Sequence, residues 1–227
     1  MFHSFLGVFW RKVQLFMPFS TRWREEPLDK VESASRFVSA RAAFVAQTTL
    51  YGYVRTRAGT RYTALFDDDL FVQSLNIAKW QIFLSCTADL AGFVAASVCA
   101  GTDRETEARL ALALFRGALA DYPEPEGAGP DWTEEVRRAE TRLQLAQPEI
   151  SDAEAAFRAS ADALVHWAPI SEELKVLDEG IVRNSIRFKW REVRERAAAL
   201  LQAEAVLQDF RPAAAGASPA TATAVGD

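Results

Sequence analysis

Histidine, cysteine and catalytic signature motifs are scarce in this chain of 227 residues, and each scarcity narrows what the protein can be. Only two cysteines occur, Cys86 and Cys99, and they form no CxxC pair. Two cysteines are too few for a disulfide framework. Both lie in an apolar run, which favours buried free thiols in a reducing compartment.

Enzyme signatures are also missing. The sequence has no GxSxG elbow, no Walker-type phosphate loop, no GxGxxG turn and no HExxH pair. A di-iron bundle needs two Glu-x-x-His motifs, which are absent. His3 lies in the terminal segment, and His166 stands beside Trp167, where a structural role is expected. We therefore expect no metal, no cofactor and no catalytic residues.

Helical periods, in contrast, run through almost the whole chain. From Leu28 to Phe210 apolar residues recur at helical spacing, which predicts an all-α helical bundle. Long helices are expected over residues 29–57 and 68–100, the second apolar on most faces, as a central helix is. It is long enough to span a membrane, but Asp89 at its middle favours a soluble core. The first helix is expected to bury Phe37, Val38, Phe44, Val45 and Tyr51.

Shorter helices are expected up to Tyr122, over residues 132–146 and over residues 152–167. A last long helix is expected from Ser171 to about Phe210, with Gly180 as a bend. The final segment, RPAAAGASPATATAVGD, has no large apolar residue apart from valine and predicts a disordered tail. The expected organisation is an arm over residues 1–19, a bundle over 28–210 and a tail over 211–227.

Aromatic residues crowd the first nineteen positions. At helical spacing they share one face, which suits a helix lying in a membrane interface; the alternative is an arm docked on the bundle or on a partner. A secretory signal is not expected, because the positive charges follow the apolar residues and no small-residue cleavage site comes after them. The residues expected to make the contact are Phe2, Phe5, Phe9, Trp10, Arg11, Lys12 and Phe16.

Two charged residues fall on apolar helix faces. Arg41 lies on the apolar face of the first long helix, and Asp89 lies on the apolar face of the second. A buried charge needs a partner, so the two side chains are expected to meet if these helices form an antiparallel hairpin. The structural interpretation is an ion pair or a polar network in the core. The functional interpretation is a polar pocket inside the bundle.

Four arginines follow one side of the last helix: Arg183, Arg187, Arg191 and Arg194. They suit an acidic partner, an anionic lipid or a nucleic acid. Nucleic acid is the weakest of these, because the net charge is −5 and no nucleic-acid-binding module is recognised. The alternative is a solvated face paired with nearby glutamates.

A third arginine group lies in the stretch RTRAGTRYTALFDDD, residues 55–69. Arg55, Arg57 and Arg61 either form an anion site or fold back onto Asp67–Asp69. Gly59 is expected to end one helix, and one of the aspartates to cap the next. A carboxylate-only metal site is the weaker alternative, because consecutive aspartates point in different directions on a helix.

Residues 49–83, TLYGYVRTRAGTRYTALFDDDLFVQSLNIAKWQIF, resemble the central region of a family of uncharacterised alphaproteobacterial proteins. Some members of that family are described as esterases. The chain has no GxSxG elbow to support that activity, and the resemblance implies no site residues.

Charge is segregated along the chain, with a balance of +6 over residues 1–66 and −10 over residues 101–180. Together with the missing catalytic sets, this favours a cytoplasmic binding protein: an adaptor, assembly factor or regulatory subunit with a protein partner, or one that also contacts an anionic membrane surface. The alternatives are a hydrolase or lyase with a polar pocket between helices, and a structural homo-oligomer.

Overall fold

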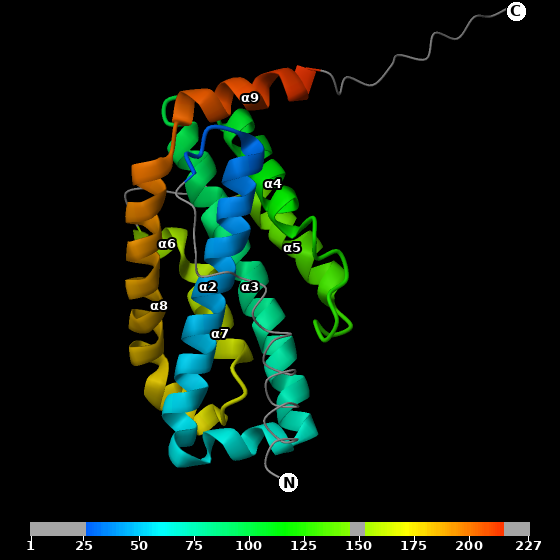
Figure 1. Ribbon diagram of the computed structural model, residues 1–227, viewed down its shortest axis with the longest axis vertical. Helices are drawn as coiled ribbons and strands as arrows, with labels where there is room; N and C mark the ends of the chain where they lie inside the picture. Colours follow the sequence, from blue (N-terminus) through cyan, green and yellow to red (C-terminus); the bar gives the residue numbers. More distant parts are fainter. Residues whose placement is uncertain (1–25, 146–152, 216–227) are drawn as a thin grey trace, which may run out of the picture.

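The computed structural model describes residues 26–145 and 153–215, and within these ranges the protein is an all-α helical bundle (Figure 1). The predicted fold class is therefore confirmed. The expected N-terminal arm, with Phe2, Phe5, Phe9, Trp10, Arg11, Lys12 and Phe16, lies outside the described residues, as does the end of the expected tail.

Two long antiparallel helices, α2 (Val31–Ala58) and α3 (Asp69–Val98), form a hairpin joined by the 3-10 segment η1 (Gly59–Asp67). Gly59 ends α2 with a φ of 54°, a conformation that favours glycine, and its N–H donates to the Arg55 carbonyl oxygen. The Asp68 carboxylate caps α3 by accepting from the N–H groups of Leu70 (2.9 Å) and Phe71 (3.2 Å). Both predicted helix-end signals are confirmed.

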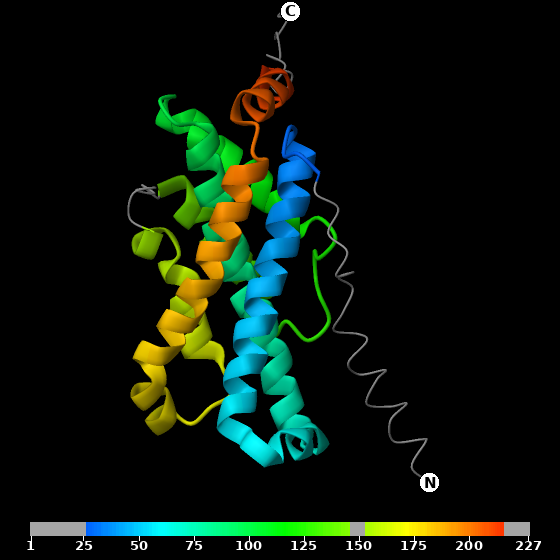
Figure 2. The same cartoon turned by 60° about the vertical axis from the view of Figure 1, so that its left-hand side comes forward.

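The chain then runs up and down alongside this hairpin. The elements that follow are α4 (Arg104–Leu119), α5 (Trp132–Leu145), α6 (Ala153–Ala156), α7 (Arg158–Trp167), α8 (Glu172–Leu200) and α9 (Ala203–Ala215). Figure 2 shows α8 alongside α2, and Figure 1 shows α9 lying across one end of the bundle.

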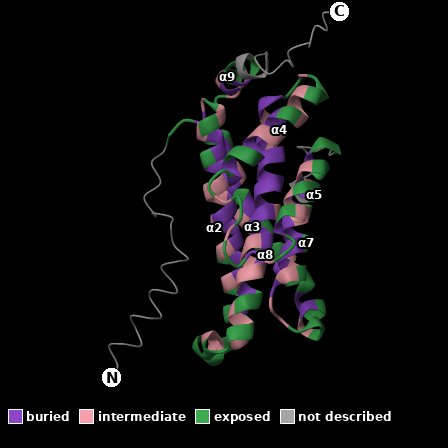
Figure 3. Cartoon of the chain, turned by 90° about the vertical axis from the view of Figure 1, so that its right-hand side faces the viewer, coloured by how far each residue is buried: buried purple, intermediate pink, exposed green. Residues whose placement is uncertain are grey.

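Helix α3 is the centre of the bundle. It contacts α2, α4, α5, α7 and α9, and most of its length is buried (Figure 3). Among the described residues it is the one helix long and apolar enough to cross a membrane, yet 72% of its most apolar window is buried inside the protein. A core helix shows this burial, because the surrounding helices occupy the positions that lipid would take.

Two predicted helices are interrupted. The helix expected over residues 152–167 breaks at Phe157 (φ −118°, ψ 25°), and α7 begins anew at Arg158. The last helix continues without a break through Gly180 and breaks instead at Leu201, which is extended. There the Leu28 backbone donates to the Leu200 carbonyl oxygen (2.9 Å) and accepts from Gln202 N–H (3.0 Å). Backbone hydrogen bonds from a distant segment thus lie at the Leu201 break.

The predicted tail begins too early. Helix α9 continues through residues 211–215, because the alanines that follow Pro212 are strong helix formers. Burial in α2 follows the prediction: Phe37, Val38 and Val45 are buried, and Phe44 and Tyr51 pack against the core.

Candidate functional site

Asp89 of α3 holds the start of α7. The Ser160 N–H donates to Asp89 Oδ2 (2.7 Å), although the two residues are 71 positions apart. Phe157, which precedes α7, makes no side-chain cap of its own. A carboxylate at a helix N-terminus satisfies an unpaired N–H and interacts favourably with the helix dipole. Asp89 therefore caps α7 from another helix.

A buried polar network continues from this cap. The Ser160 hydroxyl donates to the Phe157 carbonyl oxygen (2.9 Å) and accepts from the Trp190 indole N–H (2.9 Å). The Phe157 and Trp190 rings stack with centroids 4.4 Å apart. The network thus ties α3, α7 and α8 together in the core.

Burial raises the pKa of the Asp89 carboxyl to about 6, against the opposing effects of Arg142 and the Ser160 hydrogen bonds. An Arg142 nitrogen lies 3.6 Å from Asp89 Oδ1. Burial also raises the pKa of the neighbouring Cys86 thiol, so that thiol is protonated and unreactive. A carboxyl that titrates near pH 6 beside a pocket is a recognised feature of functional sites.

The predicted pairing of Asp89 with Arg41 is wrong. Asp89 is buried as expected, but its partners are Ser160 and Arg142. Arg41 is half-buried, lies over the Phe37 ring, and has Glu192 and Arg196 of α8 nearby. The two helices do form an antiparallel hairpin, but α7 and α5 approach Asp89 from a different side than the one Arg41 faces.

A pocket of about 420 Å³ opens beside Asp89, between α3, α4, α5, α6 and α7; we call it the Asp89 pocket. Arg104 from α4, Arg142 from α5 and Arg158 from α7 line it together with small apolar residues. The carboxylates of Glu107 and Asp162 complete its polar lining. A pocket with polar lining thus adjoins Asp89, but Arg41, the other residue of the functional interpretation, does not line it.

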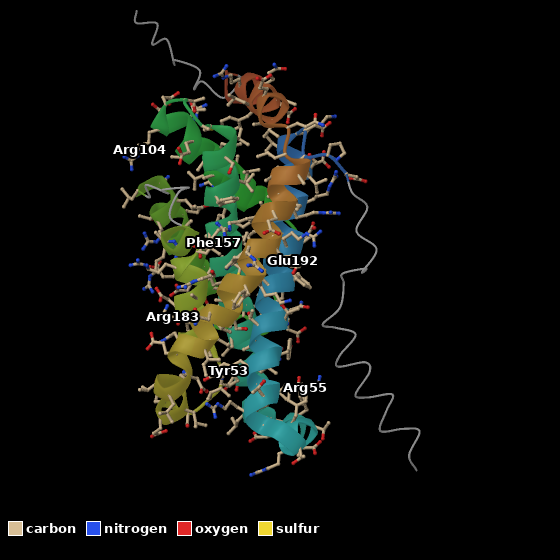
Figure 4. The ribbon with its side chains drawn as sticks, turned by 90° about the vertical axis from the view of Figure 1, so that its left-hand side faces the viewer. Tyr53, Arg55, Arg104, Phe157, Arg183 and Glu192 are labelled. Carbon is tan, nitrogen blue, oxygen red and sulfur yellow. The ribbon has the colours of Figure 1, made fainter. Side chains whose placement is uncertain are left out.

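A second cavity of about 410 Å³ lies on the other side of α7; we call it the α7–α8 cleft. Three of the four arginines predicted along the last helix line it: Arg183, Arg187 and Arg194. Arg183, labelled in Figure 4, donates to Asp162 (2.6 Å) and Glu179 (2.8 Å), and these bonds raise the pKa of its guanidinium. The Arg194 Nε is buried and has no hydrogen-bond partner among the described residues. Phe157 and Trp190 form the apolar floor.

The fourth arginine, Arg191, lies outside the cleft with its guanidinium 5.6 Å from the centre of the Phe188 ring. Phe188 belongs to a group of exposed large apolar residues on α8; we call it the α8 apolar stripe. Its members are Val176 (75% exposed), Leu177 (74%), Ile181 (73%) and Phe188 (65%).

The arginines of residues 55–61 do not gather into an anion site. Arg57 reaches across to α8 and forms an ion pair with Asp178, whose side chain is only 6% exposed. Arg55 and Arg61 are exposed and form no ion pair with any described residue. The prediction that all three fold back onto Asp67–Asp69 is wrong for Arg57, because a buried carboxylate is the stronger competitor for its guanidinium.

Sequence reasoning missed Arg104, Arg142, Arg158 and Ser160. The one signal that pointed to them was Asp89 itself, a charge on an apolar face that requires polar neighbours. Which residues become the polar neighbours of Asp89 depends on how α5 and α7 pack against α3. Within the described ranges no three histidine, cysteine or acidic side chains are grouped as a metal site would require.

Comparisons with known proteins add no relative from which a role can be transferred. No family model matches the chain, and searches of curated proteins and of solved structures found no match. The site must therefore be interpreted from its own geometry.

Proposed function

We propose that the chain is a non-enzymatic binding protein, an adaptor, assembly factor or regulatory subunit, whose outer α8 surface binds an acidic protein partner. The observation that carries the proposal is the composition of this surface. Of the six large apolar side chains exposed in the described residues, four form the α8 apolar stripe. A helix that packs only inward does not need such residues on its outer side.

Helical spacing places the arginines and the stripe on neighbouring sides of α8. At about 100° per residue, Leu177, Ile181 and Phe188 fall within about 40° of one another around the α8 axis. Val176 lies about 100–140° from them, on the side of Arg187 and Arg194. Arg187 and Arg194 lie about 100° away, at the edge of the α7–α8 cleft, and Arg191 lies between the two groups. Figure 4 shows Arg183 on the α7 side of α8 and Glu192 on its α2 side.

This combination favours a protein as the partner. Arginine and aromatic residues are enriched in protein interfaces, where they often carry most of the binding energy. A guanidinium pairs with a carboxylate through two parallel hydrogen bonds, so an acidic segment with interspersed apolar residues would match this surface. Its apolar residues would cover the α8 apolar stripe.

Two matched double variants test the proposal. Ile181→Ser with Arg187→Gln alters the α8 surface; Leu145→Ser with Arg138→Gln makes the same chemical changes on α5, where both residues are exposed. Partners are captured from the native cell with the wild-type chain and each variant. We expect one partner that the wild type and the α5 variant retain and the α8 variant loses at least tenfold. Equal retention by both variants would exclude α8 as the docking surface.

We also propose a cytoplasmic location, with residues 1–19 as a contact to an anionic membrane face or to a partner. The aromatic face and the cations of this segment support the idea. Co-sedimentation with anionic vesicles, with and without residues 1–19, is the test. Equal sedimentation of the two chains would remove the membrane contact from the proposal.

A hydrolase or lyase remains a second candidate because of one observation, the buried Asp89 carboxyl with a pKa of about 6 at the base of a pocket. Its Oδ2 is engaged in capping α7, which favours the structural role. Turnover of ester substrates that disappears in Asp89→Asn while the fold is retained would favour the enzyme. A structural homo-oligomer, joined through the α8 apolar stripe, would instead show a multiple of the chain mass in light scattering.

A further inference from the structure

The Asp89 pocket has the size of a small-molecule site. Its volume of about 420 Å³ lies within the range of roughly 300–1,000 Å³ that ligand pockets occupy. It lies on the other side of α7 from the α7–α8 cleft, and Arg158 and Asp162 of α7 line both cavities.

The wall of the pocket is apolar and built from small side chains. At Gly92 even an added Cβ would meet only a methyl group of Leu143, at 3.5 Å. Small residues on four helices leave room that no side chain of the described residues fills. They are Ala88, Gly92, Ala108, Ala111, Ala156 and Ala159. Such a wall accommodates an apolar ligand body of moderate width.

The charges of the pocket favour an anion. Arginines from three separate helices line it, and two of its three carboxylates are bonded to groups that do not line it: Asp89 accepts from the Ser160 N–H, and Asp162 from Arg183. The third carboxylate, Glu107, has Arg104 nearby: burial raises the pKa of Glu107, and the charge of Arg104 opposes that effect. Arg158 is exposed and forms no ion pair with any described residue.

We propose that the Asp89 pocket binds a small amphipathic carboxylate, whose carboxylate pairs with Arg158 and Arg142 and whose apolar body lies on the alanine-rich wall. Arg142 is available for this because its contact with Asp89 is long and its side chain is 43% exposed. A guanidinium binds a carboxylate more strongly at the mouth of an apolar pocket than in open water. The inference does not depend on the partner proposed for α8.

Octanoate is the probe, and octylammonium and inorganic phosphate are its controls. Isothermal titration calorimetry at pH 7 is expected to detect octanoate binding, at least tenfold tighter than that of octylammonium, which has the same chain with the opposite charge. Phosphate is expected to bind more weakly than octanoate, because it cannot use the apolar wall. Equal binding of octanoate and octylammonium, or tighter binding of phosphate, would overturn the proposal.

Substitutions in the lining test whether octanoate binds in the Asp89 pocket. Arg158→Gln is expected to weaken octanoate binding about fivefold, and Ala108→Leu, which fills the wall, to abolish it. Asp89→Asn is expected to strengthen binding about threefold, because it removes the negative charge that competes for Arg142. A general disturbance of the fold would weaken binding in all three variants.

Arg138→Gln is the matched control for Arg158→Gln, since Arg138 is an exposed arginine of α5 that does not line the pocket. It should leave octanoate affinity unchanged. Thermal unfolding of each variant confirms that the bundle is intact before titration. Unchanged octanoate affinity in folded Ala108→Leu would place the probe elsewhere and refute the proposal.

Discussion

The start of α3 and the start of α7 are both held by an aspartate, yet the two caps differ in almost every physical respect. Asp68 is exposed and accepts from N–H groups two and three residues ahead of it. Asp89 is buried and accepts from a residue 71 positions away on another helix. A local cap acts on one helix end, whereas the distant one also joins α3 to α7 and carries the cost of a desolvated charge.

The largest effect is expected when the buried cap is removed by a side chain with the same number of heavy atoms. Asp89→Leu removes the acceptor and leaves the Ser160 N–H buried without a partner. Asp89→Asn keeps one carbonyl oxygen in place for that bond. Urea unfolding at pH 7 is therefore expected to find the leucine variant about 2–3 kcal/mol less stable than the asparagine variant. Equal stability of the two would mean that the hydrogen bond is not what holds α7.

The stability of the protein as a function of pH tests whether the carboxyl of the buried cap, Asp89, is harder to ionise than an exposed one. The pKa of Asp89 in the folded protein, about 6, lies above its ordinary value of 3.8, so the folded state binds the proton more tightly than the unfolded chain. Stability from this group is present at low pH and is lost as the pH rises through about 6.

The measurement is the free energy of unfolding of wild type minus that of Asp89→Asn, at pH 4.5 and at pH 7. We expect this difference to fall by about 2 kcal/mol as the pH rises. Subtraction of the variant removes the contributions of other carboxylates, which both proteins share. A difference that is constant with pH would show that Asp89 titrates normally.

The third effect concerns the network behind the buried cap. Ser160→Ala keeps the N–H bonded to Asp89 but removes the hydroxyl that accepts from the buried Trp190 indole. An unpaired buried donor is expected to lower stability by about 1.5 kcal/mol. Ser74→Ala is a suitable control, because the Ser74 hydroxyl is exposed and bonds only within its own helix. It should change the unfolding free energy by less than about 0.5 kcal/mol.

The same contrast explains what could be predicted from the sequence. Helix periods, the Gly59 end of α2 and the Asp68 cap of α3 depend on neighbours within a few residues, so their patterns are visible in the chain. The break before α7 and the break at Leu201 occur where a distant segment makes hydrogen bonds. Neither leaves a local signal.

The residues of the candidate sites also differ in whether the sequence alone could group them. Arg183, Arg187 and Arg194 share one face of a single helix, so helical spacing alone brought them together in the prediction. The arginines of the Asp89 pocket come from three helices and meet only after α4, α5 and α7 have packed against α3. Asp89 signalled that a polar partner must exist, but the choice between Arg41 and Arg142 was made by helix packing.

The smallest expected effect is at the exposed cap. Asp68→Ala removes the acceptor for the Leu70 and Phe71 N–H groups, but both lie at an exposed helix end where water replaces it. We expect a loss of about 1 kcal/mol in urea unfolding, and less in Asp68→Ser, which restores an N-cap acceptor. Hydrogen exchange should be faster only in the first turn of α3, whereas Asp89→Leu should speed exchange in α7 as a whole. Faster exchange throughout the hairpin in Asp68→Ala would mean that this local cap also governs the packing of α2 against α3.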